Sequence, residues 1–142
     1  MASSSPIPRQ YHRPGGVSEK VDDATIRAVV DRFYEIAQKD SVLGPVFDAH
    51  VVDWSSHLET MYAFWASVLH GEGRYQGNPF QKHLVIRELS TEHFRRWLDL
   101  FSETLAAYCS ADDAAAWEAT ARRMGFAMSS RLDFDQQPEL LQ

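Results

Sequence analysis

Apolar side chains recur every three or four residues in four stretches of the chain, a spacing that predicts amphipathic helices. In the first stretch Ile26, Val29, Val30 and Phe33 share one stripe, and Tyr34 falls at its margin. Each stretch begins after residues whose side chains can accept the free N–H groups of a helix start: Asp22 and Asp23, Asp53, Ser90, and Ser110.

Glycine and proline divide these stretches. The first helix is expected to end before the Gly-Pro pair at 44–45, because proline disfavours helix in the residue ahead of it. Residues 46–47 are expected to continue as an irregular apolar corner. The second helix should stop where a glycine-rich loop begins, over 71–78. A short helical piece over 79–84, which carries His83, is predicted to follow that loop.

The two ends of the chain lack apolar periodicity. Residues 1–17 are rich in Ser, Pro, Gly and Arg and are expected to form a mobile arm, and residues 135–142 are expected to form a frayed tail. One folded domain is predicted between them, over 18–134. Because no segment alternates strictly between apolar and polar residues, strands are not expected and the fold class is all-α.

Composition narrows the class of protein. Hydrophobic residues make 44% and charged residues 24%, as in a soluble globular domain, while the 12% of aromatic residues favours a dense core or a pocket for a flat apolar ligand. The net charge of −6 disfavours nucleic acid and anionic membranes as partners. The single Cys109 rules out an internal disulfide, a Cys-x-x-Cys zinc knuckle and a Cys-x-x-Cys-His haem attachment. No apolar run reaches membrane-span length and the start lacks a hydrophobic signal, so a cytoplasmic location is expected.

Chemistry-bearing motifs are scarce. The chain has no nucleophile elbow, phosphate-binding loop or dinucleotide fingerprint, and its histidines lack zinc-site spacing. His83 is either a surface histidine or an axial ligand to haem iron. His57 shares an apolar face with Met61 and Trp65, so its ring is either a satisfied core histidine or faces a cavity. Tyr34 and Trp97, at the margins of apolar stripes, are either core residues or hydrogen-bond donors in a pocket.

At these positions the sequence resembles the truncated haemoglobins of the third group, which are found in bacteria. The resemblance extends from about residue 26 to residue 132. It is carried by short segments in a fixed order: Asp31-Arg-Phe-Tyr34, Leu43-Gly-Pro-Val-Phe47, Trp54-Ser-Ser-His57, Phe64-Trp65, Gly71-Glu-Gly-Arg-Tyr75, Gln81-Lys-His-Leu84 and Phe94-Arg-Arg-Trp97.

The resemblance implies a shortened globin fold in which helices enclose haem b in a two-over-two sandwich. It implies that His83 is the proximal iron ligand, and that Tyr34, His57 and Trp97 are the distal residues that stabilise a bound ligand. The remaining residues that it places against the haem or its propionates are Phe47, Met61, Trp65, Arg74, Tyr75, Lys82 and Arg87.

The function implied is reversible binding of O2, CO and NO at ferrous haem, with an electron donor that keeps the iron reduced. Two hydrogen-bond donors, Tyr34 and Trp97, would slow O2 release, which favours O2, NO or peroxide chemistry over O2 transport. His57 could control ligand access, donate a third bond, coordinate the iron or act as a general base. The alternatives are a haem peroxidase or reductase of small oxidants, and a helical interaction or sensor module in which haem is absent.

Overall fold

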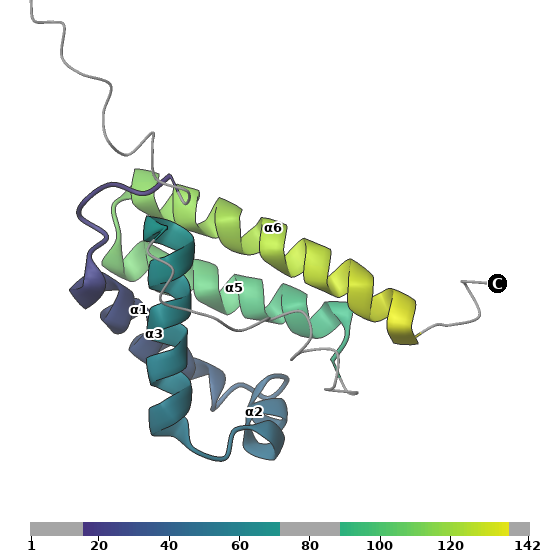
Figure 1. The fold of residues 1–142 in the computed structure, drawn as a ribbon. Helices are drawn as coiled ribbons and strands as arrows, with labels where there is room; N and C mark the ends of the chain where they lie inside the picture. The colour runs from purple at the N-terminus through teal and green to yellow at the C-terminus, as the bar shows by residue number, and fades with distance from the viewer. Residues whose placement is uncertain (1–15, 72–88, 137–142) are drawn as a thin grey trace, which may run out of the picture.

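A computed structural model of the chain describes residues 16–71 and 89–136, with side chains described through 128 (Figure 1). Within these ranges every regular element is a helix and there is no strand, which confirms the predicted all-α class. The helices are α1 (Asp23–Ala37), α2 (Gly44–His50), α3 (Trp54–His70), α5 (Thr91–Tyr108) and α6 (Ala111–Gln136). None of the described helices is long and apolar enough to cross a membrane.

The helix ends form where the capping residues predict them. The Asp22 carboxylate accepts the N–H of Thr25 at 2.9 Å and starts α1. Asp53 starts α3 in the same way, and α3 ends at Gly71, whose φ of 71° is the left-handed conformation that glycine tolerates best. At the start of α5 the Ser90 N–H donates to Nδ1 of His93 at 3.2 Å, so a histidine takes the place that an acidic residue or glutamine usually has in a capping box.

The segment between α1 and α3 differs from the prediction. We expected α1 to end before the Gly-Pro pair, and it ends at Ala37; residues 46–47 were expected to be irregular, whereas a seven-residue helix, α2, begins at Gly44. Proline in the first turn of a helix is favourable, because its missing N–H would have had no intrahelical partner there. Pro45 occupies that position and therefore starts α2 rather than preventing it.

The closest helix pairs among the described elements are α5 with α6, α1 with α5, and α1 with α3. In Figure 1, α5 and α6 run side by side, and α3 runs across their direction. The core lies between α1, α3, α5 and α6, and its largest fully buried side chains are Trp117, Phe33, Phe101, Ile26, Leu69 and Leu105. The helix α2 belongs to none of the close pairs.

The described structure includes residues on both sides of the predicted domain limits, 18 and 134. Val17, assigned to the arm, is fully buried in the core, and the adjacent Ser18 donates its N–H and its hydroxyl to the Asp113 carboxylate at 2.7 and 2.6 Å. These contacts seat residues 17–18 on the first turn of α6. At the other end α6 continues through Gln136, two residues into the predicted tail. Val17 therefore belongs with the packed residues, because its side chain fills an apolar site of the core.

Candidate functional site

Four aromatic side chains meet where α1, α2 and α3 converge. The ring centroid of Tyr34 on α1 lies 5.0 Å from that of His57, 5.4 Å from that of Phe47 and 5.6 Å from that of Trp54. Trp54 in turn contacts both His57, at 5.5 Å, and Phe47, at 5.8 Å. Most of these pairs are edge-on, the arrangement that ring quadrupoles favour. We call Tyr34, Phe47, Trp54 and His57 the aromatic cage.

Tyr34 is the most buried member of the cage, with 5% of its surface exposed. Burial raises the pKa of Tyr34 well above its ordinary value of 10, so its hydroxyl keeps its proton throughout the physiological pH range. Buried tyrosine hydroxyls usually have a hydrogen-bond partner. None of the groups in residues 16–71 and 89–128 hydrogen-bonds this hydroxyl. Its proton is therefore available for a ligand that reaches the cage.

His57 lies one turn into α3, where its N–H bonds the Asp53 carbonyl at 3.0 Å. Its side chain is half-buried, with a buried Nε2 atom, and its ring meets Tyr34 and Trp54 nearly at right angles, at 83° and 88°. The structure therefore brings Tyr34 and His57, two of the three predicted distal residues, into direct ring contact.

Trp97 belongs to a neighbouring group of rings. It stacks on Phe101 with centroids 4.6 Å apart and planes at 18°, and it lies nearly parallel to Trp65 at 6.5 Å. Its link to the cage is Phe33, whose ring edges contact Trp97 at 5.2 Å and Tyr34 at 5.0 Å. We call this second group the aromatic stack and define it as Trp65, Trp97, Phe101 and Trp117.

The profile of the bacterial-like globins matches residues 16–130, which is most of the chain and includes every residue of the cage and the stack. The chain belongs to the bacterial-like globin family. A group 3 truncated hemoglobin of Campylobacter jejuni is 37% identical over 91 residues, which are 61% of this chain and 72% of that protein. The crystal structure of the group III truncated hemoglobin from Campylobacter jejuni superposes with a TM-score of 0.76 at 30% identity, covering 82% of this chain and 94% of that one.

These similarities confirm the resemblance to group III truncated haemoglobins and the truncated globin fold. Membership of the globins implies haem as the prosthetic group. The described residues of this truncated globin fit such a group. A protonated Tyr34 hydroxyl without a hydrogen-bond partner in residues 16–71 and 89–128 lies beside the half-buried rings of Phe47 and Trp54, so apolar surface and a free donor occur together.

Other predicted haem contacts divide into two sets. Met61 is half-buried on α3 and packs against the core, and Trp65 is buried in the stack, 5.4 Å from Phe101. The predicted proximal ligand and propionate partners lie outside the described residues, and their roles in this globin stay predictions: Arg74, Tyr75, Lys82, His83 and Arg87. Within the described ranges no cluster of three or more His, Cys, Asp or Glu side chains could hold a metal ion.

Sequence analysis missed Trp54 as a site residue. Trp54 is the first residue of α3 and lies three positions before His57, so the two side chains share one face of the helix. The available signal was the capping Asp53 directly before it. That cap places Trp54 in the first turn of the helix and therefore on the same face as His57.

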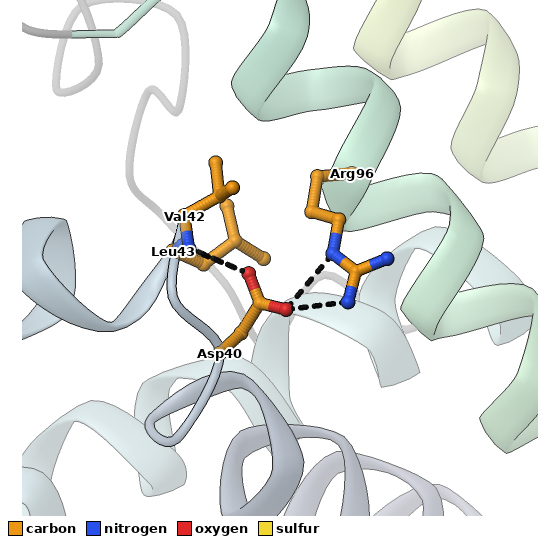
Figure 2. A network of polar contacts seen from close by, with 4 residues as sticks. All are labelled: Asp40, Val42, Leu43 and Arg96. Atoms are coloured by element: carbon orange, nitrogen blue, oxygen red, sulfur yellow. Dashed lines mark hydrogen bonds and ion pairs between the residues drawn. The ribbon is translucent and has the colours of Figure 1, made fainter.

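A second missed feature is a polar link between the α1–α2 turn and α5 (Figure 2). The Asp40 carboxylate accepts the N–H groups of Val42 and Leu43 through Oδ2, each at 3.0 Å. Its Oδ1 accepts Nε and Nη2 of Arg96 at 2.8 and 2.6 Å. These hydrogen bonds, with that of Arg96 the largest cause, lower the pKa of Asp40 below its usual range. Arg96 directly precedes Trp97, so the link joins the N-terminal side of α2 to a helix of the aromatic stack.

Proposed function

We propose that this truncated globin binds haem b and takes up the diatomic gases O2, CO and NO reversibly at the aromatic cage. When bound, ferrous haem supplies an iron atom to which such gases bind reversibly. The observation that carries the proposal is Tyr34, a buried and protonated side chain whose hydroxyl has no hydrogen-bond partner among the described residues.

Tyr34 acts as a hydrogen-bond donor toward the outer, partly negative atom of a ligand in the cage. Such a bond in a dry site is worth about 1–3 kcal/mol. The indole N–H of Trp97 is proposed as the second donor. The ring of Phe33 contacts both Trp97 and Tyr34, so a single ring lies between these two side chains. Two donors of this strength slow ligand release by about two to four powers of ten. Slow release favours chemistry on O2, NO or peroxide over O2 transport.

His57 supplies an imidazole at the same place. Its ring contacts both Tyr34 and Trp54, so it can donate a third hydrogen bond or take a proton from a peroxide as a general base. Phe47 and Trp54 cover the polar groups with apolar surface and exclude water, which strengthens each hydrogen bond in the cage.

The haem is held by residues that the family resemblance supplies. We propose His83 as its proximal ligand and Phe47, Met61 and Trp65 as apolar contacts. Arg74, Tyr75, Lys82 and Arg87 are proposed as partners of the propionates, because cations and hydroxyls satisfy carboxylates.

The first experiment is an absorption spectrum of the purified protein, reduced with dithionite and then exposed to CO. A Soret band that shifts strongly on CO addition is expected. If no Soret band appears even after hemin is added, haem binding is refuted and the protein is a helical interaction module.

The role of Tyr34 is tested by replacing it with phenylalanine. Tyr34→Phe should speed O2 release at least about tenfold, because one hydrogen bond of ~1.4 kcal/mol or more is lost while the ring remains. Tyr108→Phe is the matched control, because that ring is 45% exposed at the end of α5 and remote in sequence from the cage. Stopped-flow measurement of O2 dissociation compares the two variants, and equal rates would refute the donor role.

A further inference from the structure

The helix α2 is the least constrained described element that contributes to the aromatic cage. It belongs to none of the close helix pairs, whereas α1, α3 and α5 each belong to at least one. Its apolar attachments are Val46, which packs with Leu89 and Met128 in a small separate cluster, and the half-buried Phe47. Phe47 is also the residue that α2 contributes to the cage, so the position of α2 determines how closely that ring covers Tyr34.

Among the described residues, the buried Leu43 side chain and the Asp40 carboxylate attach the start of this helix to the body of the molecule (Figure 2). Asp40 accepts two N–H groups of the turn that leads into α2, those of Val42 and Leu43, and two N–H groups of the Arg96 guanidinium on α5. The Asp40 side chain is only 5% exposed, so these charge-assisted bonds are protected from water on the carboxylate side. The Gly44 N–H also donates to the backbone carbonyl of Asp40 at 2.8 Å. Three N–H groups of the turn, those of Val42, Leu43 and Gly44, therefore bond to Asp40.

The other end of the link is rigid. Arg96 lies on α5, which packs closely against both α1 and α6, and it precedes Trp97, whose ring is stacked on Phe101. Two N–H groups of the guanidinium converge on one carboxylate oxygen, Oδ1 of Asp40, and this pair of bonds fixes direction as well as distance. A weakly packed helix is thereby attached, across 56 residues of sequence, to the best-packed pair of helices.

We propose that Asp40 and Arg96 are positioning residues that hold α2 against the aromatic cage and so limit how readily Phe47 moves aside to admit a ligand. This inference deepens the proposed function and rests on it, because it concerns access to the same cage. Loss of the link should loosen α2 without disturbing the donors, since Tyr34 and His57 lie on α1 and α3, which pack closely on each other.

The test uses Arg96→Met, which keeps most of the length of the side chain and removes its donors. Arg95→Met, at the exposed neighbouring position on the same helix, is the matched control. The first measurement is amide hydrogen exchange over residues 41–50 of the full chain, which requires no haem. Exchange there should be about tenfold faster in Arg96→Met and unchanged in Arg95→Met, because local opening replaces charge-assisted bonds with water.

The second measurement is CO association by flash photolysis of the haem-loaded protein. CO association should be several-fold faster in Arg96→Met than in the unsubstituted protein. The rate of O2 release, which depends on Tyr34, should stay within about twofold. A general loss of structure would instead change both the association rate and the release rate. Arg96→Lys, which retains a charge but loses the planar pair of N–H donors, should fall between the two methionine variants and partly restore slow association.

The outcomes separate the two proposals. Faster exchange over 41–50 with unchanged CO association means that the link is only structural, and overturns the access role. Unchanged exchange in Arg96→Met overturns the inference altogether. A wild-type protein that takes up no haem overturns the proposed function and the access role with it, and the exchange comparison then still decides whether the link holds α2.

Discussion

Two groups of aromatic rings lie on either side of Phe33, and they are built differently. In the aromatic stack the rings of Trp65, Trp97 and Phe101 are nearly parallel, with interplanar angles of 16° to 22°. In the aromatic cage the angles run from 57° to 88°. Parallel rings present faces to one another and fill space continuously, whereas edge-on rings leave some of their faces and polar atoms directed elsewhere.

Burial follows the same division for three of the four stack rings, and the half-buried Trp97 is the exception. Phe101, Trp65 and Trp117 are at most 3% exposed, and the Trp117 indole N–H is buried without a hydrogen-bond partner among the described residues. The cage holds a hydroxyl and an imidazole among rings of which only Tyr34 is fully buried. Phe101, Trp65 and Trp117 therefore stabilise the fold, whereas the rings of the cage are less buried and lie beside hydrogen-bonding groups, as a ligand site requires.

The largest expected effect is on stability and falls on the stack. Phe101→Ala should lower the free energy of unfolding by about 3–5 kcal/mol, because it leaves a cavity between three buried rings. Trp54→Ala, in the cage, should cost only about 1–2 kcal/mol, because its ring is half-buried. Urea unfolding measures both. Equal losses would mean that the cage is as much a part of the core as the stack.

Two glycines extend this comparison to the backbone, because Gly44 lies in α2 with the cage residue Phe47 and Gly125 lies in α6 with the stack residue Trp117. A Cβ at Gly44, at the start of α2, would lie 2.6 Å from the Gln38 carbonyl oxygen, so Gly44→Ala should destabilise the protein by about 1–3 kcal/mol. A Cβ at Gly125 in α6 would meet only Leu98 Cδ1, at 3.9 Å. Gly125→Ala should therefore raise stability by about 0.5–1 kcal/mol through its higher helix propensity. Thermal unfolding should show shifts of opposite sign, and shifts of the same sign would contradict the close approach at Gly44.

The smallest expected effect is the pH dependence that the link between Asp40 and Arg96 gives to the free energy of unfolding. The pKa of Asp40 in the folded protein lies below its ordinary value of 3.8, mainly because Arg96 donates to it. Asp40 therefore stabilises the fold above that ordinary value, and this contribution is lost as the pH falls through the lower folded pKa. In Asp40→Asn the unfolding free energy should decline less between about pH 5 and pH 2 than in the original protein. If the unfolding free energies of the two proteins change with pH in the same way, the ionised Asp40 carboxylate does not stabilise the fold.

The parts of the fold that were predictable depend on local chemistry. Asp22, Asp53 and Gly71 mark helix ends because a side-chain acceptor or a left-handed backbone acts within four residues of its own position. The start of α2 was missed although Pro45 was recognised, because proline both stops a preceding helix and begins a following one. Here the Asp40 carboxylate accepts the N–H groups of the two residues before Gly44, a contact that a spacing pattern does not reveal.

The site was predictable in a different way. The contact between Tyr34 and His57 came from the family resemblance, since helical periodicity alone placed each residue only on the margin or face of its own helix. Trp54 was missed because its role depends on where α3 lies relative to α1. Arg96 was missed because its partner lies 56 residues away, and an exposed arginine has many possible acidic partners in a chain with 20 Asp and Glu residues.

The seating of residues 16–18 on α6 determines where a shortened version of this globin can begin. Gly16 has a φ of 70°, and a Cβ there would lie 3.8 Å from that of Ala116, while Val17 is fully buried. A chain cut just before α1 would lose that valine and leave the Asp113 carboxylate, which is 5% exposed, without the two hydrogen bonds from Ser18. Fusion junctions and affinity tags are therefore best placed ahead of Gly16, because the packed part of this domain begins before its first helix.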